Sequence, residues 1–136
     1  MNNLIRIGFF KELDYGHEDG NSLVESKREQ STPNEDKIVE YLTNGILLLA
    51  TPGIVEDYFD DSEIIGPPHI LTDGKYAWPE TLVYYVKNYH VKLPDNFIMH
   101  MEKNNWQTPK ENEIDLNQLK FWLYNLRQYN NFRSLK

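Results

Sequence analysis

The stretch from His69 to Met101 constrains the fold most, because nearly every position in it carries a local structural signal. Asp73-Gly74 lies between two short runs rich in β-branched and aromatic residues, which predicts a type I′ hairpin turn between strands at residues 70–72 and 75–78. Pro79 comes directly after Trp78, and we expect it to take the first position of a helix, where its missing N–H costs nothing.

Two helices are predicted after that proline. Apolar side chains recur three and four positions apart, which indicates one buried face per helix. The first face consists of Leu82, Tyr85, Val86 and Tyr89, and the second of Phe97, Ile98 and Met101. Val91-Lys92-Leu93-Pro94 separates the two helices.

The N-terminal half predicts further elements. Leu4 to Phe10 is typical of an opening strand, and Ser22 to Gln30 of a short helix capped by Ser22. A longer helix is expected from Thr32-Pro33 to a left-handed stop at Gly45. The apolar run Ile46 to Thr51 predicts a central strand that is buried on both faces.

The last part of the chain predicts a polar linker and a helix. The linker covers residues 105–114 and the helix residues 115–130. The apolar side of that helix consists of Leu116, Leu119, Leu123 and Leu126, widened by Trp122 and Tyr129. Because strands and helices do not alternate regularly, we predict one α+β domain over residues 1–136, a small mixed or antiparallel sheet packed against three to five helices.

Composition narrows the function classes. A chain of 136 residues with 40% hydrophobic residues can bury a core, and the absence of cysteine excludes disulfides and thiolate sites. No apolar run approaches the ~18 residues of a membrane helix, and the N-terminus lacks the pattern of a signal peptide. We therefore expect a soluble cytoplasmic protein that does not bind a membrane.

Charge is distributed unevenly. Residues 1–63 contain 14 acidic and 5 basic residues, whereas residues 64–136 contain 7 acidic and 9 basic residues. An acidic half without clusters of lysine and arginine argues against nucleic-acid binding. It favours a basic protein partner, which opposite charge steers into contact. The simpler interpretation is that the surplus acid only keeps the protein in solution.

The segment Ile54 to Ile65 has the composition of a protein-recognition surface, since acids can orient a partner and aromatics can supply burial. The predicted partner-binding residues are Glu56, Asp57, Tyr58, Phe59, Asp60, Asp61 and Glu63. The alternative is a solvated acidic loop in which Tyr58 and Phe59 pack inward.

Catalytic and metal signals are weak. Asp14, His17, Glu18 and Asp19 form the most metal-like group, yet their spacing matches no established metal motif, and a solvated turn explains it as well. His69, His90 and His100 show no ligand spacing, and an ordinary role at a helix C-terminus suffices for His90. There is no nucleophile elbow or phosphate loop. We therefore predict no enzymatic activity, no cofactor and no bound metal.

Two stretches resemble a group of small uncharacterised bacterial proteins. The run from Leu71 to His100 is similar to their signature of TDG, W-P, L-x-Y-Y-V, Y-H-V and L-P, and Tyr15 to Leu23 is similar to a second shared segment. The resemblance covers most of residues 4–101. In size, acidity and lack of catalytic motifs the group is similar to immunity proteins, which neutralise bacterial toxins.

This resemblance implies a cytoplasmic immunity protein that binds a basic toxin domain, such as a nuclease, through the acidic segment. The acids would take the place of phosphates in the cationic cleft of the toxin, with Tyr58 or Phe59 as an anchor. The alternative is a small metal-binding domain or metal-dependent enzyme that uses the Asp14–Asp19 loop. A third possibility is a homodimeric scaffold.

Overall fold

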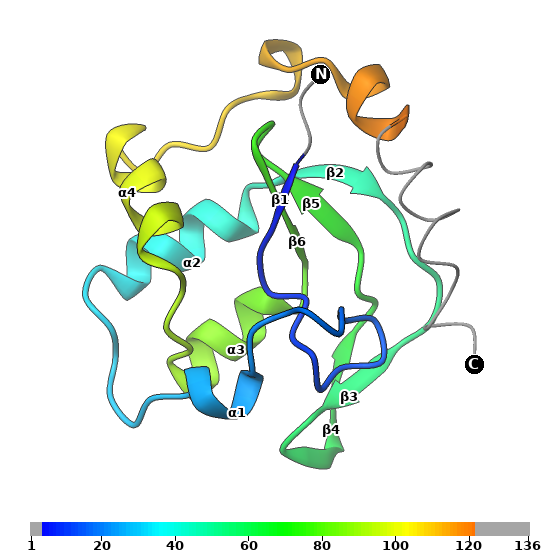
Figure 1. Cartoon of the computed structure of the whole chain (residues 1–136), viewed down its shortest axis with the longest axis vertical. Coiled ribbons are helices and arrows are strands. Elements are labelled where there is room, and N and C mark those ends of the chain that lie inside the picture. Colours follow the sequence, from blue (N-terminus) through cyan, green and yellow to red (C-terminus); the bar gives the residue numbers. More distant parts are fainter. Residues whose placement is uncertain (1–3, 122–136) are drawn as a thin grey trace.

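The computed structural model describes residues 4–121 and shows a small single-domain α+β fold (Figure 1). The elements are β1 (Ile5–Arg6), α1 (Leu23–Ser26), α2 (Glu35–Thr43), β2 (Ile46–Leu49), β3 (Val55–Asp57), β4 (Asp60–Gly66), β5 (Ile70–Thr72), β6 (Tyr76–Pro79), α3 (Leu82–Tyr89), α4 (Asp95–Lys103) and the 3₁₀ turn η1 (Glu111–Glu113). Residues 116–121 are also helical.

The strands form two sheets. A four-stranded sheet has the order β1-β6-β5-β2, in which β1 runs parallel to β6 and the other neighbours are antiparallel. The strands β3 and β4 form a separate two-stranded antiparallel sheet within the described part of the chain. This arrangement confirms the predicted fold class. In Figure 1 the chain runs from β2 into β3 and from β4 back into β5, so the β3–β4 hairpin extends from one end of the larger sheet.

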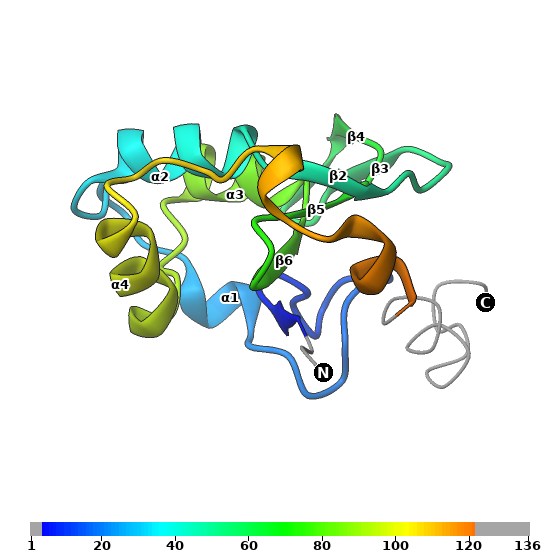
Figure 2. The ribbon, with the colours of Figure 1, turned by 90° about the horizontal axis from the view of Figure 1, so that it is seen from above.

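The core lies between the larger sheet and α2, α3 and α4, which gather on one side of it (Figures 1 and 2). Trp78 of β6 is fully buried in this core, where its indole N–H donates to the carbonyl oxygen of Leu42 at 3.2 Å. Five residues of the predicted helical faces are buried: Leu82, Tyr85, Val86, Phe97 and Met101. The other two, Tyr89 and Ile98, are half-buried and pack against the core.

The turn between β5 and β6 contains Asp73-Gly74, but it is neither centred there nor of type I′. Thr72 pairs with Ala77, and the backbone N–H of Asp73 donates to the carbonyl of Tyr76, so Gly74 and Lys75 are the central residues. Type I′ needs positive φ at both central residues, and of these two only Gly74 has it, at 98°. The Asp73 side chain fixes the turn instead, because its Oδ1 accepts the backbone N–H groups of Lys75 and Tyr76 at 2.9 and 2.7 Å.

Pro79 ends a strand instead of beginning a helix. It is the last residue of β6 and lies opposite Ile70 of β5, at a strand end where a missing N–H is tolerated. The backbone N–H of Glu80 donates to the carbonyl of His69 at 2.7 Å, which continues the contact between the two chain segments. The helix α3 therefore begins three residues later than expected, at Leu82.

The helix α2 also differs at both ends from its prediction. It begins at Glu35 after a left-handed Asn34 (φ 61°), two residues beyond Pro33. Gly45 is not a left-handed stop, because its φ is not positive. A Cβ on Gly45 would lie 2.7 Å from the Trp78 ring, so glycine is required there for close packing.

The apolar run that follows is an edge strand, not a central one. Among residues 4–121, strand β2 pairs only with β5, and 51% of Leu47 is exposed while Leu48 is buried. The prediction was wrong because a run of consecutive apolar residues does not show whether a strand has one neighbour or two.

The two N-terminal elements are shorter than predicted. Strand β1 holds two residues, and a positive φ of 82° at Gly8 follows it. Helix α1 has the expected cap, since the Ser22 hydroxyl oxygen accepts the backbone N–H of Glu25 at 3.2 Å, but it ends at Ser26 because Lys27 is extended.

The segment 105–114 lies against the body of the protein. The Thr108 hydroxyl donates to the carbonyl of Tyr41 at 2.8 Å, and Ile114 packs beside Gly74. Asp115 caps the helical residues 116–121 by accepting the backbone N–H of Gln118. The predicted core positions Trp122, Leu123, Leu126 and Tyr129 lie outside the described residues. Within residues 4–121, no helix is long and apolar enough to cross a membrane.

Candidate functional site

The acidic segment is a β-hairpin and not a loop. Residues 54–66, called the acidic hairpin below, comprise β3, the turn residues Tyr58-Phe59 and β4. Glu56 lies opposite Ile64, and Asp57 opposite Asp60 at the turn. The register shifts twice along the pair, so β4 is irregular and longer than β3. The sequence did not predict this strand, because charged and apolar residues do not alternate clearly along it.

The tip of the hairpin is fixed to the protein by a buried carboxylate. Only 2% of Asp57 is exposed, and its side chain points into the protein instead of toward solvent. Its Oδ2 accepts the hydroxyl groups of Tyr84 and Tyr89 at 2.8 and 2.5 Å, and its Oδ1 accepts the backbone N–H of Phe59 at 2.8 Å. A buried carboxylate needs such donors, because an unpaired charge there would be strongly destabilising.

The turn makes further contacts with α3. The backbone N–H of Tyr58 donates to the Tyr85 hydroxyl at 3.0 Å. The Phe59 ring packs on Tyr89 with centroids 4.7 Å apart, and the ammonium of Lys27 lies 4.5 Å from the Phe59 centroid. We call Tyr84, Tyr85 and Tyr89 the tyrosine clamp. All three come from α3, so one helix positions the whole tip.

The clamp tyrosines stay neutral at physiological pH. The hydrogen bond to Asp57 raises the pKa of Tyr84 to about 12, and burial and the Asp57 charge act in the same direction. The same hydrogen bond, with burial, raises the pKa of Tyr89. Burial is the main cause that raises the pKa of Tyr85. Only a neutral hydroxyl can donate to the Asp57 carboxylate, and a neutral hydroxyl is not repelled by the negative charge beside it.

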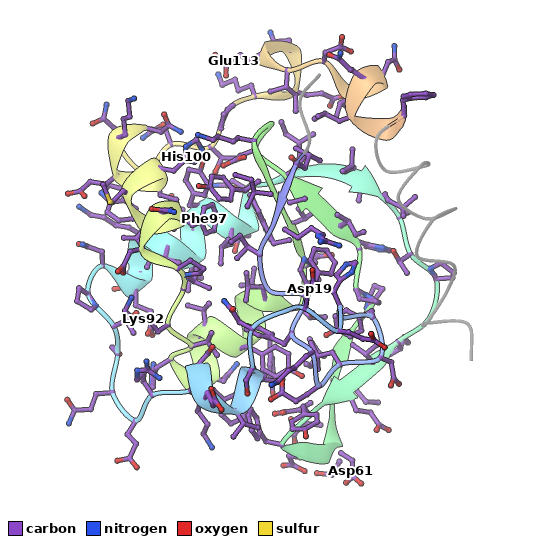
Figure 3. All side chains as sticks on the ribbon, viewed as in Figure 1. Asp19, Asp61, Lys92, Phe97, His100 and Glu113 are labelled. Atoms are coloured by element: carbon purple, nitrogen blue, oxygen red, sulfur yellow. The ribbon has the colours of Figure 1, made fainter. Side chains whose placement is uncertain are left out.

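The outward side of the hairpin carries the remaining acids. Glu56, Asp60, Asp61 and Glu63 are exposed, and Asp61 lies at the far end of the molecule in Figure 3. Hydrogen bonds from the hydroxyl and backbone N–H of Ser62 lower the pKa of Asp60.

Apolar groups lie among these acids. The exposed fractions are 68% for Ile64 and 48% for Tyr58, and Ile64 is paired directly with Glu56. The hairpin therefore offers both charge and apolar area to a partner, which is the mixture found in protein interfaces.

The structure corrects two of the seven predicted partner-binding residues. Asp57 and Phe59 contact the tyrosine clamp, so they anchor the hairpin and do not face outward. Five of the predicted residues are exposed: Glu56, Tyr58, Asp60, Asp61 and Glu63. Sequence reasoning missed the clamp, because it assigned Tyr89 to the core face of its helix and gave Tyr84 no role, and no local signal links either residue to residue 57.

The Asp14–Asp19 loop contacts a protein cation. The Arg6 guanidinium donates to Nδ1 of His17 at 2.9 Å and lies 3.7 Å from the carboxylate of Asp19, while Asp14 and Glu18 are exposed. An arginine between the histidine and the carboxylate is unfavourable for a bound metal, because the two cations would repel. No group of three metal-ligating side chains is found among residues 4–121.

The three histidines considered in the sequence do not converge. Nδ1 of His69 accepts the backbone N–H of Thr51 at 2.8 Å. His90 pairs with the Glu35 carboxylate of α2 at 3.0 Å, so its ring joins two helices while its backbone N–H bonds Val86. His100 lies 3.1 Å from Oδ2 of Asp73, a side chain that also accepts the Tyr41 hydroxyl. Each ring thus has its own structural partner.

No protein-family model, no curated protein and no solved structure matches the chain.

Proposed function

We propose that this protein is an immunity protein, which binds a basic domain of a cognate bacterial toxin through the acidic hairpin and thereby neutralises it. The observation that carries the proposal is the combination of an outward acidic face with a buried anchor. Four exposed carboxylates stand on a hairpin whose tip is held by Asp57 and the tyrosine clamp.

The charge of the hairpin indicates that the partner surface is positively charged. Exposed carboxylates attract a cationic surface and speed the encounter, and they disfavour acidic partners and nucleic acids. In a toxin that acts on a phosphodiester, the cleft is cationic, and Asp60, Asp61 and Glu63 would occupy the positions of substrate phosphates. Tyr58 and Ile64 would supply the apolar contact that slows dissociation.

Anchoring supports the same interpretation. A loop that must be ordered on binding loses conformational freedom, which lowers affinity, whereas a preorganised surface does not. Asp57 has three donors and Phe59 packs on α3, so the hairpin tip is already ordered in the free protein. A solvated acidic tail that served only solubility would need none of these contacts.

The test uses the gene beside this one. Its product is expressed alone in a bacterial host and then together with this protein, and growth and complex formation are measured. We expect growth arrest by the neighbour alone, rescue by co-expression, and a stable complex of the two purified proteins.

Charge reversal locates the surface. The double variant Asp61→Lys/Glu63→Lys should lose rescue and complex formation. Its matched control is Glu102→Lys/Glu111→Lys, which changes the net charge equally at exposed positions away from the hairpin. Equal rescue by both variants would refute the acidic hairpin as the interface, and a harmless, non-binding neighbour would remove the immunity proposal itself.

A further inference from the structure

Strand β4 has an open edge. It spans the seven residues Asp60–Gly66 and pairs with β3 on one side, in a sheet of only two strands. Within residues 4–121, no strand pairs with its other edge. The open edge of a strand presents backbone N–H and C=O groups in a row, and such a row is a template for a strand from another chain.

The surroundings leave this edge accessible. The residues from Asp60 to Ile64 are all exposed. The loop of residues 9–20 overlaps the hairpin in Figure 1, but the perpendicular view in Figure 2 places the two on opposite sides of the molecule. The contacts that fix the tip involve Asp57 and the turn. These contacts do not involve the outer edge of β4.

The side chains along β4 determine which charge a strand must carry to pair there. Asp60 and Ser62 lie on one face, since their side chains share a 2.6 Å hydrogen bond, and the exposed Asp61 and Glu63 flank Ser62 in the sequence. A second copy of the chain would bring like charges opposite each other, which is destabilising in a strand pair. A strand with lysine or arginine at alternate positions would instead place a cation opposite each acid.

We propose that the acidic hairpin recognises its partner by β-strand addition, in which a basic strand of the partner pairs with the open edge of β4. This inference rests on the proposed function and specifies its contact. Backbone hydrogen bonds to β4 would supply affinity, and the alternate positions facing Asp61 and Glu63 would supply selectivity for basic residues. Recognition by acidic side chains alone would need no such backbone pairing.

The test uses a defined peptide. The heptapeptide Lys-Val-Lys-Val-Lys-Val-Lys is titrated into the isotope-labelled full-length protein, and amide shifts and amide hydrogen exchange are followed by magnetic resonance. We expect saturable shifts confined to the acidic hairpin, with alternate amides of residues 61–65 exchanging at least tenfold more slowly. The same peptide with alternate backbone N-methyl groups keeps its charge but cannot pair, and should bind at least tenfold more weakly.

Each result decides the proposal. Equal binding of the methylated and unmethylated peptides, or binding without slower exchange in β4, would overturn strand addition and leave the proposed function to the co-expression test. Retention of peptide binding by Asp61→Lys/Glu63→Lys would overturn the basic selectivity. A dimer of the protein alone with protected β4 amides would assign the edge to a second copy and overturn the proposed occupant.

Discussion

Replacing Asp57 by alanine tests the anchor of the acidic hairpin. The substitution removes the acceptor for the hydroxyl groups of Tyr84 and Tyr89 and for the backbone N–H of Phe59. A hydrogen bond to a charged group contributes about 1.5–3 kcal/mol. Both tyrosines are partly exposed, so water would replace part of what they lose. We therefore expect the free energy of unfolding to fall by about 2–4 kcal/mol.

Urea unfolding followed by circular dichroism measures this loss, with Asp61→Ala as the matched control. Asp61 is exposed on the same hairpin, and its substitution should leave the unfolding free energy unchanged. Hydrogen exchange in the folded protein shows whether the tip opens locally, since the amides of Tyr58 and Phe59 should exchange faster in Asp57→Ala. Equal stability and equal exchange in the two variants would refute the anchoring role of Asp57.

Three further predictions concern stability. Tyr84 has a pKa of about 12 in the folded protein, above the ~10 of an unfolded tyrosine. The unfolded state therefore loses its proton first, so the unfolding free energy should fall as pH rises from 10 to 12. Urea titrations at several pH values would measure this fall, which should be less steep in Tyr84→Phe. Gly45→Ala should cost about 1–3 kcal/mol in the same urea assay, because its Cβ would lie 2.7 Å from the Trp78 ring; an unchanged midpoint would contradict the close packing. Tyr41→Phe removes a 2.6 Å hydrogen bond to the buried Asp73 and should lower the melting temperature. An unchanged value would show that His100 and the backbone N–H groups of Lys75 and Tyr76 suffice for that carboxylate.

Local signals in the sequence predicted local structure well. The Ser22 cap, a turn that contains Asp73-Gly74 and the buried faces of α3 and α4 depend on residues within a few positions of one another. Such features follow from capping, turn chemistry and helical periodicity, so they can be derived without the rest of the chain.

Features set by distant contacts were not predictable in the same way. Gly45 reads as a helix stop, but its role depends on Trp78, which is 33 residues away. The edge position of β2 depends on which strand pairs with β5.

The candidate site shows both cases. The exposed acids were predicted from composition, because a run of charges is seldom buried. The inward turn of Asp57 was not, because it depends on hydroxyl groups of α3 about 30 residues further along the chain. Residue type alone could not separate the one anchoring acid from the four exposed ones.

The most direct test of the central claim measures the association of this protein with the product of its neighbouring gene at two salt concentrations. Interaction through the acidic hairpin predicts that the association rate falls steeply as salt rises, and that Asp61→Lys/Glu63→Lys loses most of both the rate and its salt dependence while Glu102→Lys/Glu111→Lys keeps them. Equal association rates and equal salt dependence in the two double variants would contradict the account.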